Sequence, residues 1–242
     1  MRPKSVAFIP ARSGSNRVPN KNIKLLGGHP MLAYTVRAAI DSSAFDAVIC
    51  ATDSQLYADV ARHYGAEVPF LRSSEISGDK SPDIEWVVWM LNTLKEQGRD
   101  YESFSILRPT SPFRLPETIR RACDAFTSDP GADSLRAIEK CKQHPGKMWT
   151  VSRNRMHPLI PMSYRGTPWH SCQTQSLPAV YAQNASLEIA WVDTVWRTKS
   201  IAGHAVMPYF MPKNEGFDIN TKRDWAMALL MVRAGVPLPE VV

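Results

Sequence analysis

The stretch that decides the fold is SVAFIPARSGSNRVPNKN at residues 5–22. Its apolar run, VAFI at 6–9, is bounded by polar residues and by Pro, which is typical of a short strand buried on both faces. A loop of small polar residues and cations follows directly. After Pro30, apolar residues such as Leu32 and Val36 recur at helical spacing, which predicts a helix that begins at the proline. The chain therefore opens with a strand, a polar loop and a helix.

The same alternation continues to about residue 140. Further strand-like runs are AVICA at 47–51, EVPFL at 67–71, FSIL at 104–107 and SLRAI at 134–138. Helix-like stretches separate them, beginning after Asp53 and Ser54, at Pro82 and at Pro116. Strands that alternate with helices predict an α/β fold, in which a mostly parallel sheet has helices on both faces.

Regular periodicity is lost between residues 141 and 180, where Pro, Trp, Tyr and Met are mixed. This segment is too aromatic for a linker, so we expect an arm that covers a site or packs on a second subunit. Strand-like runs return at 186–192 and 204–208, and an amphipathic helix around Trp225 follows. We therefore expect one domain over 1–242 with an irregular arm at 141–180.

Composition limits the class of protein. The chain has 242 residues, 44% hydrophobic and 21% charged, which indicates a globular protein. No stretch is long and apolar enough for a signal peptide or a membrane span, so we expect no membrane partner. The four cysteines lack metal-ligand spacing, which favours free thiols in a reducing cytoplasm. A net charge of +6 makes an anionic partner plausible.

The segments that follow predicted strands should carry the chemistry, because ligands of open parallel sheets bind at the carboxyl ends of the strands. The first loop sets Arg12, Arg17 and Lys21 among small residues, which suits a polyphosphate, although an ordinary polar turn would have similar composition. Neither GxxxxGK[ST] nor GxGxxG is present. Asp53 follows the second strand, where a helix cap is as plausible as a ligand contact. RPTSPFR at 108–114 is a proline-stiffened turn suited to binding.

Several motifs together resemble one family. They are IPARSGSNRVPNKN at 9–22, ATDS at 51–54, LRSSEISGD at 71–79, LRPTSPFR at 107–114, HPGK at 144–147 and FDIN at 217–220. In order and spacing they are similar to the acylneuraminate cytidylyltransferases, which include the CMP-sialic, CMP-pseudaminic and CMP-legionaminic acid synthetases. The resemblance covers nearly the whole chain and is densest up to residue 126.

This resemblance implies a Rossmann-like nucleotidyltransferase. A hydroxyl of an acidic nine-carbon sugar would attack the α-phosphate of CTP, with Mg²⁺ as cofactor, and the arm would make a homodimer. The implied catalytic residues are Arg12, Lys21 and Asp218. The implied nucleotide-binding residues are Ala11, Arg12, Ser13, Gly14, Ser15, Lys21, Asn22, Arg72, Ser81 and Thr110. The implied acceptor-binding residues are Arg108, Thr110, Ser111 and Asn184, and the implied metal ligands are Asp218 and, as a weak second ligand or none, Asn220.

The chain departs from the family pattern at several of these positions. Asn16 stands where the family has Lys, Arg108 where it has Gln, and Asn220 where it has Asp. Thr174 and Ala182 stand where relatives place arginines for the sugar carboxylate. A second hypothesis therefore keeps the nucleotidyltransferase and changes the acceptor to another acidic sugar, a sugar phosphate or a phosphonate, or changes the nucleotide. A third, a module that binds a nucleotide or nucleic acid without catalysis, has least support because the basic residues are dispersed.

Overall fold

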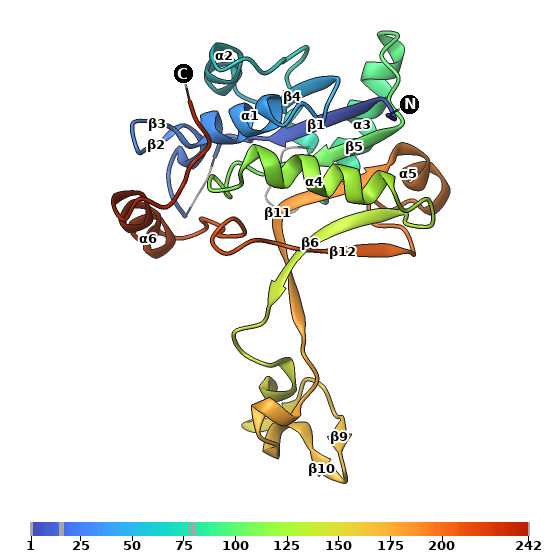
Figure 1. Ribbon diagram of the computed structural model, residues 1–242, viewed down its shortest axis with the longest axis vertical. Coiled ribbons are helices and arrows are strands. Elements are labelled where there is room, and N and C mark those ends of the chain that lie inside the picture. The colour runs from blue at the N-terminus through green and yellow to red at the C-terminus, as the bar shows by residue number, and fades with distance from the viewer. Residues whose placement is uncertain (1, 15–16, 77, 79–80, 242) are drawn as a thin grey trace. The chain divides into compact units, whose positions relative to one another are not determined.

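The computed structural model describes residues 2–14, 17–76, 78 and 81–241. The chain divides into two compact units. The first comprises residues 1–137 and 184–242, and the second comprises residues 138–183. The first unit contains a six-stranded sheet with its helices, and the second contains short hairpins (Figure 1).

The sheet has the strand order β12-β6-β11-β5-β1-β4. Its strands are β1 (Ser5–Pro10), β4 (Ala47–Ala51), β5 (Ser103–Ile106), β6 (Ser134–Lys140), β11 (Tyr181–Trp191) and β12 (Val206–Phe210). β1 is parallel to both β4 and β5, with Phe8 opposite Ile49 and Ile106. β11 runs antiparallel to β5, so the sheet is mixed and mostly parallel. The predicted α/β fold class is confirmed.

Helices pack on both faces of the sheet, because successive side chains of β1 point to opposite faces and nearly all of them are buried. Ala7 and Ile9 face the core cluster with α1 (Met31–Asp41), α2 (Gln55–His63) and α4 (Pro116–Thr127). Val6 and Phe8 face the other cluster, with α3 (Asp83–Glu96) and α5 (Val192–Thr198). Both faces of β1 are therefore apolar, which explains why its sequence is a continuous apolar run rather than an alternating one.

The strand predicted at 67–71 is wrong. Glu67 makes only an isolated bridge to Ile49, so this segment follows β4 without extending the sheet. The helices predicted after Pro30, Ser54, Pro82 and Pro116 are confirmed. Helix α5 was not predicted from the sequence. The remaining short elements of the first unit are β2 (Leu25–Leu26), β3 (His29–Pro30), η1 (Lys21–Ile23) and η2 (Ser74–Ile76), and its last helix is α6 (Lys222–Arg233).

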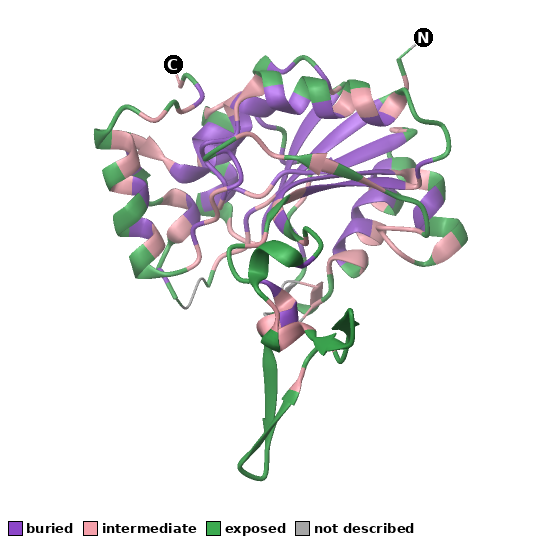
Figure 2. Ribbon diagram, turned by 60° about the horizontal axis from the view of Figure 1, so that its bottom comes forward, coloured by how far each residue is buried: buried purple, intermediate pink, exposed green. Residues whose placement is uncertain are grey.

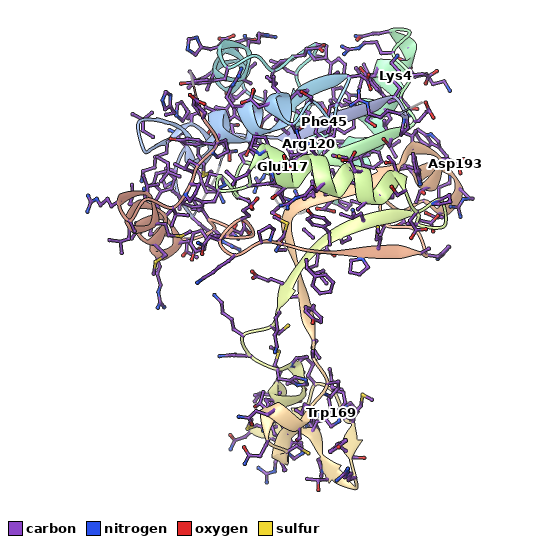
Figure 3. The ribbon with its side chains drawn as sticks, viewed as in Figure 1. Lys4, Phe45, Glu117, Arg120, Trp169 and Asp193 are labelled. Carbon is purple, nitrogen blue, oxygen red and sulfur yellow. The ribbon has the colours of Figure 1, made fainter. Side chains whose placement is uncertain are left out.

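The second unit is built from short hairpins and single helical turns. Its strands are β7 (Trp149–Ser152), β8 (Arg155–Pro158), β9 (Ser163–Tyr164) and β10 (Thr167–Pro168), and its turns are η3 (Pro145–Lys147), η4 (Trp169–Ser171) and η5 (Thr174–Ser176). β7 and β8 are exposed throughout nearly their whole length (Figure 2). His144 stabilises the unit locally. The centre of its ring lies 5.6 Å from that of Trp169, which is labelled in Figure 3, its Nδ1 accepts from Gly146 N at 3.0 Å, and its Nε2 lies 3.0 Å from Pro178 O.

Candidate active site

The first loop begins where β1 ends, and its neighbours shape it. The backbone N–H of Ala11 donates to Ala51 O at 3.0 Å, so the loop leaves the sheet beside β4. Asp53 then accepts hydrogen bonds from the backbone N–H of Ser13 at 2.6 Å and from its hydroxyl at 3.0 Å. Gly14 has a φ of +75°, and among the described residues no atom lies within 4 Å of the place that a Cβ would occupy, so this side of its backbone is open to a ligand. Ser15 lies outside the described residues.

Of the two cap candidates, Asp53 and Ser54, it is Ser54 that forms the N-cap of α2, where it accepts from Tyr57 N at 3.5 Å. Asp53 instead fixes the predicted phosphate loop. Asn22 has a similar role. It is 5% exposed, and its amide donates to Arg12 O at 3.3 Å. Asn22 and Asp53 thus hold the loop in shape, so that the cations of the loop can face a ligand.

A pocket of about 220 Å³ lies beside this loop, and charged residues dominate its wall. It is lined by Pro10, Arg12, Arg72, Gly78, Ser81, Asp83, Trp86 and Arg108. Four of these were predicted as binding residues from the sequence, and they come from segments that follow β1, β4 and β5. The carboxyl ends of the parallel strands therefore bring them together, as the fold predicts.

Arg72 is held deep in this pocket wall. It is 6% exposed, its guanidinium carbon lies 5.2 Å from the centre of the Trp86 ring, and its backbone N–H donates to Thr52 O at 2.8 Å. Burial lowers the pKa of Arg72, while the negative charges of Asp53 and Asp83 oppose that shift. The Arg72 Nε–H is buried and has no hydrogen-bond partner in the described part of the chain, so a bound anion would satisfy it.

Arg108 forms ion pairs with two carboxylates. Its Nη2 lies 2.5 Å from Asp83 Oδ2 and 3.1 Å from Glu188 Oε1. Burial alone would lower the pKa of Arg108, but the hydrogen bond and charge of Asp83 raise it. In the same way burial would raise the pKa of Asp83, and Arg108 holds it below its usual value. The pair therefore stays ionised at the pocket wall.

Lys21 lies between the first loop and the closing motif FDIN. Its Nζ donates to Ile219 O at 2.6 Å and approaches Asn220 Oδ1 at 3.4 Å. Burial lowers the pKa of Lys21; Asp218 opposes this, and Arg17 and Arg12 add to it. A lysine with a lowered pKa and cationic neighbours gains most from an incoming anion.

A backbone hydrogen bond connects the closing motif FDIN at 217–220 to the turn PTSP at 109–112, which we call the PTSP turn. Ile219 is fully buried, and its N–H donates to Thr110 O at 2.8 Å. Asp218 Oδ2 accepts from the Asn220 amide, whereas Asp218 Oδ1 is buried and has no partner among the residues that the structure describes. Asn220 N donates to Asp224 Oδ2 at 3.0 Å, at the start of α6. The structure thus brings Lys21, Thr110, Asp218 and Asn220 to one place, as predicted.

Below the PTSP turn, Arg114 links α1 to β11. It is 1% exposed and donates to Ser186 O and, at 3.3 Å, to Thr35 Oγ1. Asn184 lies two residues before Ser186 on β11, and its Oδ1 accepts from the Ser186 hydroxyl at 2.9 Å. Ser111 is fully buried.

Buried polar atoms without a partner mark this region most clearly. Among the residues that the structure describes there are seven such side-chain atoms, and four belong to residues predicted from the sequence to bind substrates or metal. These four are Arg72 Nε, Ser111 Oγ, Asn184 Nδ2 and Asp218 Oδ1. Since buried polar groups are nearly always hydrogen-bonded, the concentration of exceptions here indicates a place prepared for ligands.

Sequence reasoning missed Asp83, Trp86, Glu188 and Arg136. Arg136 Nη1 lies 3.2 Å from Glu188 Oε2, so it extends the ion pairs of Arg108. A signal was present, because Glu188 and Arg136 are charged residues inside strands that otherwise read as apolar, SLEIAWV and SLRAI. Charged residues are almost never fully buried unless they are paired, so each one predicted a partner.

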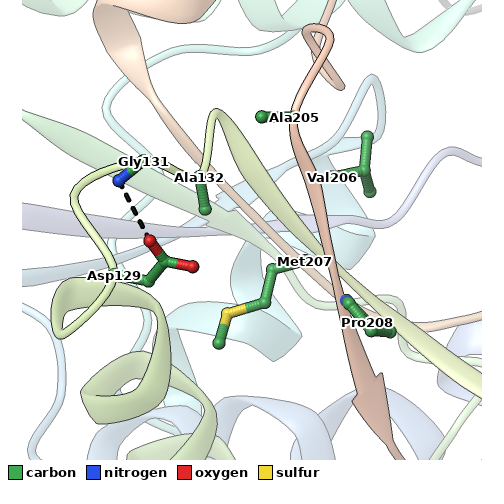
Figure 4. A pocket seen from close by; sticks show the side chains of 7 residues that line it. All are labelled: Asp129, Gly131, Ala132, Ala205, Val206, Met207 and Pro208. Atoms are coloured by element: carbon green, nitrogen blue, oxygen red, sulfur yellow. Dashed lines mark hydrogen bonds between the residues drawn. The ribbon is translucent and has the colours of Figure 1, made fainter.

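Larger hollows lie elsewhere, along the edge strand β12. One of about 550 Å³ is lined by Asp129, Gly131, Ala132, Ala205, Val206, Met207 and Pro208 (Figure 4). Its one carboxylate, that of Asp129, accepts from Gly131 N at 3.0 Å. This hollow has no cation among the described residues of its lining, and a second one, of about 420 Å³, has a single cation, Arg121, among mainly apolar residues. The smaller pocket at the strand ends, with three arginines in its lining, is therefore the better candidate for a phosphate-binding active site.

Two further findings concern the described residues as a whole. None of the helices described is long and apolar enough to cross a membrane. No group of three or more His, Cys, Asp or Glu side chains in the described ranges is arranged to hold a metal ion by itself.

A mostly parallel sheet with a cationic pocket at the carboxyl ends of its strands is typical of nucleotide-binding enzymes. Residues 6–128 match the family described as Cytidylyltransferase. The CMP-N,N'-diacetyllegionaminic acid synthase of Legionella pneumophila is 34% identical over 224 residues, which cover 92% of this chain and 93% of that protein. The chain therefore belongs to the cytidylyltransferase family and is a nucleotidyltransferase.

Other similar proteins are also named as cytidylyltransferases or as CMP-sugar synthetases. The N-acylneuraminate cytidylyltransferase of Escherichia coli is 32% identical over 232 residues, which cover 95% of this chain but only 52% of that protein. The chain thus spans about half the length of this relative. Among solved structures, that of CMP:2-keto-3-deoxy-manno-octonic acid synthetase complexed with CTP has a TM-score of 0.67 and 15% sequence identity, covering 96% of this chain and 99% of that one. This likeness confirms the fold.

Proposed function

We propose that the enzyme transfers CMP from CTP to a hydroxyl of a nonulosonic acid, such as legionaminic, sialic or pseudaminic acid, and releases pyrophosphate. The observation that carries the proposal is the set of buried polar atoms without a partner among the described residues, at Arg72, Ser111 and Asp218 on segments that follow strands and at Asn184 on β11. The names of the relatives supply the substrates, because a legionaminic acid synthase and an N-acylneuraminate cytidylyltransferase are each more than 30% identical to the chain.

In the proposed reaction an oxygen of the acceptor attacks the α-phosphorus of CTP. A bond forms between this oxygen and phosphorus, the bond from phosphorus to the bridging oxygen breaks, and pyrophosphate leaves with the electron pair. The hydroxyl proton passes to solvent. The protein has to hold the attacking oxygen, phosphorus and leaving group in line, and to offset the negative charge of the leaving pyrophosphate.

The nucleotide is proposed to lie along the first loop. Arg12 and Lys21 would contact the triphosphate, and the open backbone at Gly14 lets N–H groups approach it closely. Arg72 and Ser81 line the adjoining pocket. Several separate cations, Arg12, Lys21 and Arg72, suit a triphosphate, because its negative charge is spread over several oxygens.

The acceptor is proposed to lie between the PTSP turn and β11. Arg108 would bind its anionic group through the N–H groups that its two carboxylate partners leave open, by charge-assisted hydrogen bonds. Thr110 and Asn184 would contact its hydroxyl and amide groups. Asn184 Nδ2 supports this part of the proposal, since it is buried and has no partner among the described residues.

Mg²⁺ is proposed as the cofactor, and the residues present fit it. Asp218 offers a buried carboxylate oxygen without a partner, and Mg²⁺ in phosphate-processing sites is commonly held by one or two carboxylates, substrate phosphates and water. Asn220 could add an amide oxygen, which is a weaker ligand. When bound, the ion would neutralise charge on the phosphate oxygens.

A homodimer through residues 141–180 is also proposed. Exposed apolar side chains of the second unit support it, namely Met148, Trp149, Val151, Met156, Leu159, Met162 and Tyr164, with Val151 72% exposed. A surface of this kind favours burial against another copy, and two-fold pairing is the commonest way to achieve it. Sedimentation should show a dimer at micromolar concentration that Trp149→Glu weakens; a monomer in both proteins would refute the dimer.

We also propose a cytoplasmic location, because the four cysteines are unpaired, as is usual for proteins of a reducing compartment.

The reaction is tested by offering the purified protein each of the four nucleoside triphosphates with a panel of acceptors and Mg²⁺, and measuring pyrophosphate. The panel should hold legionaminic, sialic and pseudaminic acids, another acidic sugar, a sugar phosphate and a phosphonate. We expect release with CTP and a nonulosonic acid. Release only with a different acceptor or nucleotide would support the second hypothesis, and no release with any pair would refute both.

A further inference from the structure

Four charged side chains of alternating sign form a row that starts in the pocket and ends inside the sheet. We call Asp83, Arg108, Glu188 and Arg136 the charge row. Its contacts are Asp83 Oδ2 to Arg108 Nη2 at 2.5 Å, Arg108 Nη2 to Glu188 Oε1 at 3.1 Å, and Glu188 Oε2 to Arg136 Nη1 at 3.2 Å. The four residues come from α3, the PTSP turn, β11 and β6, so only the tertiary fold brings them together.

The two carboxylates that contact Arg108 differ in burial. The Asp83 side chain is 31% exposed and lines the pocket, whereas the Glu188 side chain is 5% exposed and does not. Behind Glu188, the Arg136 side chain is 6% exposed and donates to Ile201 O. Glu188 therefore reaches the pocket only through Arg108, and its charge is matched by an arginine on each side.

These contacts fix the orientation of the Arg108 guanidinium. Asp83 engages both Nη atoms, since its Oδ1 also lies 3.5 Å from Nη1, and Glu188 takes the second proton of Nη2. Three of the five N–H groups of an arginine side chain are thereby directed at carboxylates held by two different elements. The guanidinium plane is then set before a ligand arrives, and two N–H groups remain outside these contacts.

We infer that Glu188 is a positioning residue for the acceptor, acting through Arg108, with Arg136 holding Glu188 in place. This rests on the proposed function, in which Arg108 binds the anionic group of the acceptor. A long, flexible side chain loses rotamer entropy when it binds, and a carboxylate that orients it beforehand reduces that cost. Burial keeps the Glu188–Arg108 interaction from being screened by salt.

The alternative is that the charge row is an ordinary structural ion pair. Removing Glu188 would then lower the free energy of unfolding and change the KM values for the acceptor and for CTP to a similar extent. A positioning role predicts a different result, in which the KM for the acceptor rises while the KM for CTP stays constant. It also predicts that the effect of Glu188 depends on Arg108.

Steady-state kinetics of Glu188→Gln distinguish these outcomes. Losing a charged hydrogen bond corresponds to a rise of about tenfold or more in acceptor KM, with the KM for CTP unchanged within about twofold. In an Arg108→Gln background the same substitution should add nothing. Glu67→Gln serves as the control, because it removes an ion pair with Arg99, with contacts at 2.7 and 3.2 Å, that lies outside the pocket lining. Equal changes in both KM values, or additive effects in the double variant, would overturn the inference.

Glu188→Asp covers the case in which Glu188→Gln does not fold. It keeps the charge but shortens the side chain, so it should raise the acceptor KM in the same selective way. An unchanged acceptor KM in this folded variant would overturn the inference.

A measurement without substrate separates this inference from the proposed function. In protein labelled with ¹⁵N-arginine, the guanidinium of Arg108 should rotate slowly and give resolved Nη signals, which Arg108→Lys assigns by their loss. Glu188→Gln should average these signals, and unchanged signals would refute positioning whatever the acceptor proves to be. Absence of pyrophosphate release with every acceptor, together with averaged signals, would refute the proposed function and retain the orienting role of Glu188.

Discussion

Replacing Lys21 by methionine removes one charge from the active site and changes its volume little. In the free enzyme the Lys21 Nζ donates to Ile219 O at 2.6 Å, beside the carboxylate of Asp218. Arg12, on the same loop, lowers the pKa of Lys21, as does Arg17. A triphosphate bound at this loop would therefore meet a cation whose charge the protein alone compensates only in part.

The size of the effect follows from the contact that is lost. A hydrogen bond to a charged group contributes about 1.5–3 kcal/mol, and each 1.4 kcal/mol is a factor of ten in affinity. Lys21→Met should thus weaken CTP binding by about 10- to 150-fold. Lys21→Arg keeps the charge and should lose much less, although its larger planar head fits the contact to Ile219 O less well.

Isothermal titration with CTP measures this directly, and its pH dependence adds a second check. Burial lowers the pKa of Lys21, so the free enzyme loses this proton below the usual range of a lysine. A bound triphosphate favours the protonated form, and CTP affinity should therefore fall as the pH rises through that lowered pKa. Lys21→Arg should flatten this fall. An unchanged CTP affinity in Lys21→Met, at neutral pH and with a folded protein, would refute the role of Lys21.

Three further predictions concern other parts of the structure. Asp218→Asn should abolish Mg²⁺-dependent turnover while circular dichroism stays unchanged; full activity at an unchanged Mg²⁺ requirement would contradict the metal assignment. Arg114→Lys should lower the free energy of unfolding by about 1–3 kcal/mol in urea titrations, because a lysine cannot bridge Ser186 O and Thr35 Oγ1; an unchanged midpoint would count against this bridge. Burial raises the pKa of the Cys50 and Cys123 thiols to about 12, so at pH 8 a thiol reagent should modify only Cys141 and Cys172 in the native protein; rapid reaction of all four would contradict it.

Some of the fold follows from local properties of the chain. The run at 6–9 is apolar at every position because β1 is buried on both faces, and a short continuous run is the local sign of that burial. The run at 67–71 has a similar composition but forms no strand, since it makes only a single bridge to Ile49 beside β4. Only Val68 of this segment is buried, whereas Glu67, Pro69 and Leu71 are exposed. A short apolar run therefore predicts neither burial nor pairing by itself, and Pro69 has no N–H to donate to a neighbouring strand.

The sequence by itself determined most of the sheet strands, the helices α1 to α4 and α6, and the loops that should carry the chemistry, because hydrophobic period, helix caps and prolines act over a few residues. The family resemblance also predicted Arg12, Arg72, Ser81 and Arg108 as binding residues, and the fold gathers them at one pocket. Only the tertiary structure decided that Arg108 lies between Asp83 and Glu188, 25 and 80 residues away in the chain. The physical reason is that an ion pair between distant segments leaves no periodic pattern, and its partners are chosen by the register of strands that pair only in the folded sheet.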